Sequence, residues 1–369
     1  MVPMKILLAM SGGVDSSVTA HLLKEQGHEV IGMMMKLWTD PLAPEALRGN
    51  PKSCCSVEHI QRARGVCDDL SIPFYVVDAE EAFRSIVIEP FLDDHAKGET
   101  PNPCIVCNKH IKFGLLFEKS EELGCDRIAT GHYVRTAEEK DLDGSVRHIL
   151  LEGKDPQKDQ SYFLYTLTQE RLQRILFPLG NMYKQDVYEL AQKFKVPIPD
   201  HYRETQDVCF YPEKTKDAFL RRYLKDIATG DICKEDGTKV GTHEGLPFYT
   251  VGQRKGLGIG GLQIPLHVTR KDTKTNTVYV TESGCDLGTA VPAHSLSWIS
   301  WSPKASEEQR FLAKVHSSAE KKPGTLLYSG TSGVFTFDEP QRGISPGQAL
   351  VLYKEEELVG GGTIAENHK

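Results

Sequence analysis

The sequence predicts an α/β nucleotide-binding domain, a small central module and a C-terminal β-barrel. Apolar runs alternate with amphipathic helical stretches in the first half of the chain, a Gly- and Pro-rich segment follows from Gly230, and short β-like runs fill the remainder. At roughly 100 to 200 residues per domain, 369 residues suffice for two or three domains. We place their limits at residues 1–212, 213–277 and 278–369.

The first domain starts with a strand, a turn and a helix. Ile6–Met10 is a continuous apolar run, Gly12 and Gly13 form the turn, and apolar residues recur at helical spacing until Gly27. Strands that alternate with helices predict a parallel, doubly wound sheet. The further strands are expected at Val30–Met35, Phe74–Val77 and Arg127–Thr130, and the further helices at His59–Leu70, Phe113–Leu123 and Lys184–Phe194.

Other signals mark the two remaining domains. The last helical periodicity lies at Lys214–Leu224, and glycines then crowd around Gln253-Arg254-Lys255, which predicts an ordered loop in a small β-containing module. A β-barrel is expected at the C-terminus, because short β-like runs there are separated by turn residues. These runs are Thr277–Val280, Phe311–Val315, Leu326–Tyr328 and Val334–Phe337.

The composition predicts a soluble protein. Hydrophobic residues make up 39% of the chain and charged residues 26%, and no apolar run approaches the roughly 18 to 20 residues of a membrane span. The N-terminal residues are unlike a signal peptide, so we expect a cytoplasmic protein that contacts no membrane. The net charge of −7 argues against a general nucleic-acid binder, but residues 203–274 are net basic and can meet phosphate.

The segment Ser11–Ser17 has the features of an anion-binding loop. It joins a strand to a helix, its glycines let backbone N–H groups approach a ligand, and a helix N-terminus favours negative charge. It lacks the Gly-Lys-Ser/Thr ending of the P-loop in kinases and GTPases. An ordinary turn with serine caps is the alternative. The whole segment resembles the pyrophosphatase-type loop of adenylating enzymes, which implies ATP cleavage between the α- and β-phosphates and contact of Asp15 with Mg²⁺ or pyrophosphate.

Two cysteines lie three positions apart before a predicted helix. Nine cysteines in so long a chain do not form a disulfide scaffold, so they are read as thiols, metal ligands or redox groups. The helix end and Lys109 are expected to lower the pKa of Cys104 and Cys107 and to favour thiolate. A packed core pair or half of a zinc site is the alternative, but zinc needs a second close pair, and Cys54-Cys55 is adjacent.

An ordered set of motifs resembles the tRNA-specific 2-thiouridylases almost from end to end. The resemblance implies an adenine nucleotide alpha-hydrolase-like fold for the N-terminal domain. Beside the phosphate loop, the matching segments are Cys54-Cys55-Ser56, Thr100–Phe113, Thr130–Tyr133, Lys158–Phe163, Asp207–Phe210, Gly245–Ile259 and Ser345–Gln348.

The resemblance also implies roles for individual residues. Cys107 matches the nucleophilic cysteine and Cys209 the cysteine that carries sulfur as a persulfide. The matched nucleotide positions are Ala9, Met10, Ser11, Gly12, Gly13, Val14, Asp15, Ser16, Met35 and Gly131. The matched tRNA positions are His132, Lys158, Asp159, Gln160, Ser161 and Gln348, with Asn102, Pro103 and Cys104 beside the target base. Arg254 and Lys255, in a glycine-rich loop, can bind RNA phosphates.

The implied reaction uses ATP and Mg²⁺ to 2-thiolate the wobble uridine of a tRNA anticodon. The C2 oxygen is adenylated, sulfur from Cys209 attacks C2, and Cys107 resolves the persulfide by forming a disulfide. The implied partners are tRNA and a persulfide-donating sulfur-relay protein or cysteine desulfurase.

Two sequence departures leave alternatives open. Cys104 occupies a position where many family members have Asp, so it serves either as an acid or base or, with Cys107 and Cys209, as a ligand of a [4Fe–4S] cluster. At Val315-His316-Ser317 the chain lacks the Arg-Tyr pair that the resemblance leads us to expect as a tRNA contact. More distant alternatives are another adenylating synthetase with the same loop, and a non-enzymatic iron–sulfur or RNA-binding protein.

Overall fold

The N-terminal sheet is parallel and carries helices on both faces, as predicted. Our computed structural model describes residues 2–48, 57–140, 144–198, 208–213, 215–260, 265–282 and 287–366. The five strands follow the order β3-β2-β1-β4-β7. Their bounds are β1 Lys5–Ala9, β2 Glu29–Lys36, β3 Phe74–Asp78, β4 Arg127–Ala129 and β7 Ile175–Leu176.

Side chains of β1 alternate between the two faces, which explains the double layer. Ile6 and Leu8 pack in the cluster that includes Ala20 and Ala63, on α1 and α3, whereas Leu7 packs with Phe113 of α7 on the opposite face. The helices of this domain are α1 Val14–Glu25, α2 Glu45–Arg48, α3 Val57–Asp69, α7 Phe113–Glu122, α8 Gln169–Leu172 and α9 Lys184–Lys193.

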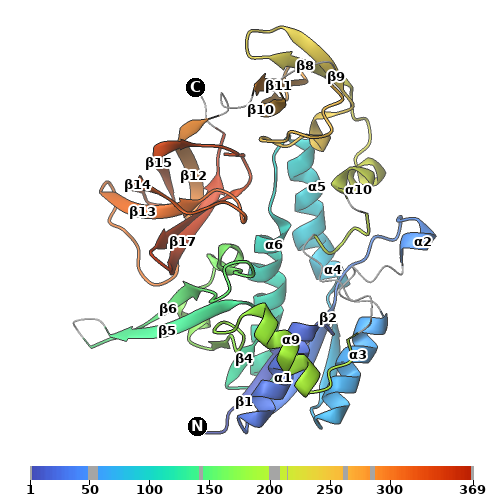
Figure 1. The fold of residues 1–369 in the computed structure, drawn as a ribbon, viewed down its shortest axis with the longest axis vertical. Coiled ribbons are helices and arrows are strands. Elements are labelled where there is room, and N and C mark those ends of the chain that lie inside the picture. Colours follow the sequence, from blue (N-terminus) through green and yellow to red (C-terminus); the bar gives the residue numbers. More distant parts are fainter. Residues whose placement is uncertain are drawn as a thin grey trace.

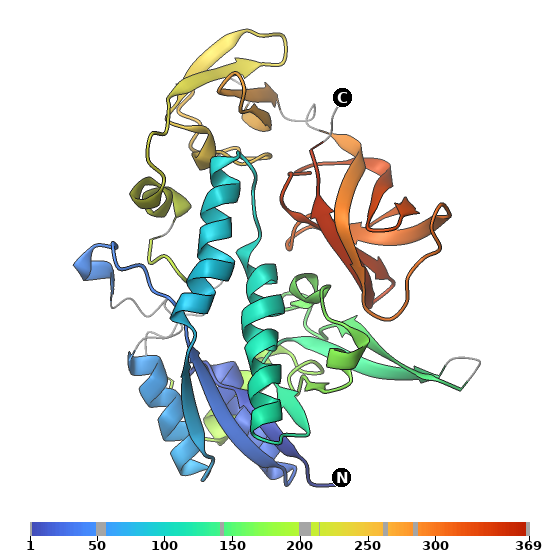
Figure 2. The same ribbon diagram turned by 180° about the vertical axis from the view of Figure 1, so that it is seen from behind.

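Two long helical columns rise from this domain between the other two parts of the molecule (Figure 1). The first column comprises α4 Glu80–Phe83, η1 Arg84–Ile88 and α5 Glu89–Ala96, and our sequence analysis missed it. The second comprises α6 Pro103–Val106, η2 Cys107–Lys112 and α7. Both η1 and η2 are π-helical, a geometry that often marks functional sites. Figure 2 shows the same two columns side by side from behind.

The central module is a four-stranded sheet in the order β10-β11-β8-β9. Our assignment of Thr277–Val280 to the barrel was wrong, because this run lies in β11, which pairs with β10 and β8. The elements of the module are α10 Lys216–Tyr223, β8 Gly230–Lys234, β9 Lys239–His243, η4 Leu246–Phe248, β10 Leu266–Asp272 and β11 Thr277–Glu282.

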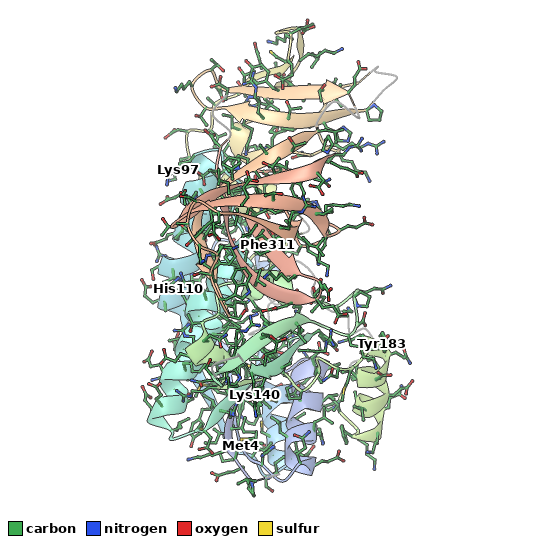
Figure 3. All side chains as sticks on the ribbon, turned by 90° about the vertical axis from the view of Figure 1, so that its left-hand side faces the viewer. Met4, Lys97, His110, Lys140, Tyr183 and Phe311 are labelled. Atoms are coloured by element: carbon green, nitrogen blue, oxygen red, sulfur yellow. The ribbon has the colours of Figure 1, made fainter. Side chains whose placement is uncertain are left out.

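The C-terminal domain is a six-stranded barrel, which β12 closes by pairing with both β15 and β17. A hairpin from the N-terminal half, β5 Val134–Lys140 and β6 Val146–Glu152, extends the barrel sheet, because Leu150 and Leu151 pair with β17. Figure 3 places Phe311 of the barrel between Lys140 of this hairpin and Lys97 after α5. The barrel strands are β12 Gly288–Trp298, β13 Glu308–Lys314, β14 Lys322–Ser329, β15 Ser332–Gln341, β16 Ala349–Lys354 and β17 Glu357–Ile364.

Candidate functional site

A cavity of about 240 Å³ opens at the carboxyl ends of the parallel strands, where open α/β sheets bind ligands. Most of the positions matched to nucleotide contact line it, namely Ala9, Met10, Ser11, Asp15, Ser16, Met35 and Gly131. Gln160 and His132, which we matched to tRNA, line the same cavity. Its other lining residues, which the sequence analysis did not select, are Met33, Met34, Leu37, Lys112 and Thr130.

The backbone of the phosphate loop is built around glycine. Gly12 has a φ of +70°, and a Cβ at this position would collide with the carbonyl of His59 on α3. Gly13 caps α1, and its carbonyl accepts hydrogen bonds from the hydroxyls of Ser16 and Ser17 at 3.1 and 3.0 Å. Val14 turns away from the cavity into the core beside α9. The sequence therefore builds a tight turn with a helix N-terminus directed at the cavity.

Asp15 is held by two side chains that the sequence analysis missed. Its Oδ1 accepts hydrogen bonds from the Tyr133 hydroxyl at 2.7 Å and from Nζ of Lys184 at 2.6 Å. Lys184 is buried, with 8% of its surface exposed. No sequence signal marks it, because Lys184 lies 169 positions from Asp15 and starts what reads as an ordinary amphipathic helix. A carboxylate suits Mg²⁺, which commonly binds one or two carboxylates and substrate phosphates.

An arginine also contacts the phosphate loop from α3. Nε of Arg62 donates to the carbonyl of Gly12 at 3.1 Å. Its Nη2 is buried and, within the described residues, has no hydrogen-bond partner. An unpaired guanidinium nitrogen beside an anion-binding loop is a donor suited to phosphate.

The structure brings the three selected thiols together. Cys107 is buried in a hydrophobic cluster against which Cys209 also packs, and charge on Cys209 would act on both Cys104 and Cys107. Cys104 and Cys107 are free thiols. Cys209 is 102 positions from Cys107, so only the tertiary fold joins them. Cys54, Cys55 and Cys285 lie outside the described residues.

Our expectation that the two helical thiols have a lowered pKa was wrong. Burial raises the pKa of Cys107 to about 12 and that of Cys104 to about 11, and the positive charge of Lys112 offsets only part of this. Lys109, which we expected to stabilise thiolate, is exposed on η2. In this conformation both groups are therefore protonated thiols at neutral pH.

The three thiols do not form a metal site in this arrangement. Among the described residues, which include Cys104, Cys107 and Cys209, no group of three His, Cys, Asp or Glu side chains could hold a metal ion. The geometry thus does not fit the cluster, and we derive no step through it.

His132 and Lys112 line the nucleotide cavity, and Lys112 is also close enough to the thiols to act on them. The charge of Lys112 acts on Cys104, Cys107 and His132. Burial keeps the pKa of His132 well below its ordinary value, so the ring is neutral. Its Nδ1 lies 2.8 Å from the hydroxyl of Thr130, and the ring stacks on Phe113.

The residues matched to tRNA contact differ in their exposure. Ser161 is fully buried, with its hydroxyl donating to Asp159, which in turn accepts from the Gly153 amide. By contrast, Arg254 and Lys255 are exposed on the glycine-rich loop of the central module. Their positions fit phosphate contact, whereas Ser161 and Asp159 hold the loop that contains Lys158 and Gln160.

The strap of residues 97–102 leads from α5 to the cysteine helix and contacts the barrel. Nε2 of Gln348 donates to the carbonyl of Thr100 at 2.8 Å, and the Thr100 amide donates to the carbonyl of Pro346 at 3.0 Å. Asn102 caps α6, and Pro103 is its first residue. Gln348, which we matched to tRNA, thus joins two parts of this chain.

Family models match all three parts of the chain. Their descriptions are "tRNA methyl transferase HUP domain" for residues 4–213, "tRNA methyl transferase PRC-barrel domain" for residues 217–282 and "Aminomethyltransferase beta-barrel domain" for residues 289–364. The tRNA-specific 2-thiouridylase MnmA 1 of Caldanaerobacter subterraneus is 44% identical over 362 residues, which cover 98% of this chain and 97% of that protein. This chain belongs to the tRNA-specific 2-thiouridylase family. 

Other 2-thiouridylases match over the same length. The one from Geobacter metallireducens is 43% identical and covers 98% of this chain and 96% of its own. Among solved structures, the NMN synthetase of Francisella tularensis aligns with 53% of this chain and 63% of its own, at 15% identity and a TM-score of 0.32. No helix in the described part of the chain is long and apolar enough to cross a membrane.

Proposed function

We propose that this chain catalyses ATP-dependent 2-thiolation of the wobble uridine in tRNA, with Cys209 as the persulfide carrier. The observation that carries the proposal is the position of Lys112. It lines the cavity at the phosphate loop, and its charge acts on Cys104 and Cys107, which supports an adenylation site and a sulfur-transfer site that adjoin each other. Membership of the 2-thiouridylase family supports the same reaction.

Adenylation is the first half of the proposed reaction. The uridine C2 oxygen attacks the α-phosphate of ATP, the bond to the β-phosphate breaks, and pyrophosphate leaves toward the phosphate loop. The α1 N-terminus and Lys184 favour the charge of pyrophosphate there, and Asp15 would contact the Mg²⁺ that offsets phosphate charge. The neutral His132 ring and the charged Lys112 line the same cavity.

Sulfur transfer is the second half. The terminal sulfur of a Cys209 persulfide attacks C2, and the C2–O bond to AMP breaks. The Cys107 thiolate then attacks Sγ of Cys209, which forms a Cys107–Cys209 disulfide and leaves the electron pair of the broken S–S bond on the sulfur of 2-thiouridine. A thiol reductant returns the disulfide to two thiols. Because both helical thiols are protonated in this structure, we infer that substrate binding alters their surroundings before attack.

The proposal implies two macromolecular partners in the cytoplasm. The first is tRNA, whose phosphates fit the exposed Arg254 and Lys255 and whose target base would lie near Asn102, Pro103 and Cys104. Lys158, Gln160 and Gln348 are proposed to contact it as well. The second partner is a persulfide donor, either a sulfur-relay protein or a cysteine desulfurase, because the chain has no other sulfur source in the proposed reaction.

Nucleoside mass spectrometry of unmodified tRNA tests the proposal. The anaerobically purified protein is incubated with Mg-ATP and either a persulfide donor or inorganic sulfide. We expect 2-thiouridine with the persulfide donor in iron-free protein. Cys107→Ser and Cys209→Ser should abolish the product but still form AMP, whereas Cys233→Ser, which changes a free thiol on β8, should behave as wild type.

Other outcomes would redirect the assignment. A requirement for bound iron would replace the persulfide route by the cluster. AMP formation without thiouridine under every condition would favour another adenylating synthetase, and tRNA binding that ATP does not affect would favour a binding protein without this activity.

A further inference from the structure

A short turn, η3 (Ser161–Leu164), lies between the barrel and the helix that carries Cys104 and Cys107. On its barrel side, the hydroxyl of Ser161 lies 3.1 Å from that of Tyr353 on β16. On its other side, Nδ2 of Asn108 in η2 donates to the carbonyl of Phe163 at 3.4 Å. The turn therefore contacts both structures at once.

Tyr162, in the middle of this turn, joins the two sides through one hydroxyl group. The side chain is 1% exposed, and the hydroxyl donates to the carbonyl of Ala349 on β16 at 3.0 Å. The side chain of Asn102 lies close enough to the same hydroxyl to act on its pKa. Burial raises the pKa of Tyr162, so the group remains a protonated donor at every working pH.

Asn102 is the residue whose position decides where the cysteine helix begins. It is the N-cap of α6, with extended backbone angles of φ −110° and ψ 91°, and Pro103 follows at the first helical position. A fixed N-cap fixes the direction of the helix, and Cys104 and Cys107 lie within its first two turns. The proximity of Asn102 to Tyr162, whose hydroxyl donates to Ala349, thus connects barrel strand β16 to the placement of both thiols.

We propose that Tyr162 is a positioning residue that couples the barrel to the cysteine helix by holding Asn102 against the backbone of Ala349. This inference rests on the proposed sulfur transfer, because it assigns Tyr162 to the placement of the reacting thiols. The neighbouring contacts of Thr100 with Pro346 and Gln348 fix the same strap to the same turn of the barrel. The barrel is then a structural part of the active site as well as a candidate tRNA surface.

Two tyrosine variants test the inference. Tyr162→Phe removes the hydroxyl and keeps the buried ring. Tyr165→Phe is the matched control, because Tyr165 packs in the same cluster and its hydroxyl bonds Thr363 of β17, which is not part of the strap. We expect faster hydrogen exchange at residues 100–112 and at least a tenfold lower kcat for thiolation in Tyr162→Phe, with an unchanged KM for ATP. Tyr165→Phe should change neither quantity more than twofold.

A glycine pair tests the same link without changing Tyr162. Gly347 has a φ of +88°, and a Cβ there would lie 3.0 Å from the backbone nitrogen and oxygen of Thr100. Gly347→Ala therefore pushes the barrel turn away from the strap and should reproduce the exchange pattern at 100–112. Gly330 also has a positive φ, of +71°, but no described residue lies within 4 Å of its added Cβ, so Gly330→Ala controls for backbone strain.

The two readouts separate this inference from the proposed function. Hydrogen exchange is measured without substrate, so it tests the link even if the wild-type chain does not thiolate tRNA. Exchange at 100–112 that is the same in Tyr162→Phe and Tyr165→Phe would overturn the coupling. If Tyr162→Phe does not fold, the two glycine variants test the coupling instead. Equal exchange at residues 100–112 in Gly347→Ala and Gly330→Ala would then overturn the coupling.

Discussion

Nζ of Lys184 lies 2.6 Å from Oδ1 of Asp15, which joins the first residue of α9 to the first turn of α1. The Tyr133 hydroxyl donates to the same oxygen at 2.7 Å. The carboxylate that follows the phosphate loop is therefore held and charge-balanced by side chains from two distant parts of the chain.

Lys184→Met should impair adenylation. The variant keeps most of the side-chain volume but leaves Asp15 without its cation beside the phosphate loop. We expect tRNA-dependent AMP formation to fall at least tenfold, which corresponds to about 1.4 kcal/mol of activation free energy. Lys193→Met, at the exposed end of the same helix, is the control and should keep wild-type activity. Equal rates for the two variants would contradict a role of Lys184 at this site.

Gly12→Ala should abolish ATP binding because the phosphate loop has no room for a Cβ. The added atom would meet the carbonyl of His59, and the loop would have to move away from α3. Gly27 has a comparable positive φ, of +81°, but no described residue lies within 4 Å of a Cβ added there, so Gly27→Ala is the control. The control should lose about 1 to 2 kcal/mol of stability and no ATP affinity. Calorimetric titration with ATP distinguishes the two variants. Tight ATP binding by Gly12→Ala would show that the phosphate loop can accommodate a Cβ at this position.

Alkylation of Cys107 should accelerate steadily with pH. A pKa of about 12, raised by burial, predicts that the thiolate fraction grows about tenfold per pH unit from pH 7 to 9, without a plateau. Lys112→Gln should slow labelling further, because the charge of Lys112 lowers the pKa of this thiol. Peptide mass spectrometry after iodoacetamide treatment measures both rates. A plateau below pH 9 would show that the free enzyme holds Cys107 as an accessible thiolate.

His95 should make the fold sensitive to mild acid. It is 2% exposed on α5, and burial together with Lys216 and Lys271 lowers its pKa to about 3. Below about pH 6.5 the unfolded chain binds a proton on this ring and the folded chain does not. The contribution of His95 to the free energy of unfolding is therefore complete above pH 6.5 and is lost progressively toward pH 3.

His95→Phe keeps a ring against Phe91 and removes this titration. Between pH 6.5 and 5.5, the free energy of unfolding of the wild type should fall by about 1 kcal/mol more than that of the variant. Denaturant titrations at each pH measure the difference, with exposed His294→Gln as the control. Parallel slopes for His95→Phe and the wild type would show that folding does not lower the pKa of His95.

Local patterns predicted the elements of the N-terminal domain well. The expected helix at His59–Leu70 is α3, and the expected strand at Phe74–Val77 lies within β3. Hydrophobic periodicity is a local property of the chain, and it is strong here because these elements bury one face or both. The π-helical turn that contains Cys107 has no such signal, since its geometry depends on how α6 and α7 pack against η1 and η3.

Longer-range pairings could not be predicted. The β5–β6 hairpin joins the barrel although it lies in the first half of the chain, and Thr277–Val280 joins the central sheet although it reads like the barrel strands. Alternating side chains predict that a segment is a strand, but its partner depends on which edge the fold presents to it. The same holds for Lys184 and Tyr162, whose importance comes from contacts with residues far away in sequence.

The sequence by itself determined the phosphate loop, the family motifs and the choice of candidate thiols, because each depends on residue types within short motifs. Tertiary structure alone decided that Cys104, Cys107 and Cys209 meet, that burial raises the pKa of the two helical thiols, and that Lys112 both lines the nucleotide cavity and acts on these two thiols. The physical reason is that desolvation and charge–charge interaction depend on distance in space, which a local sequence pattern does not encode.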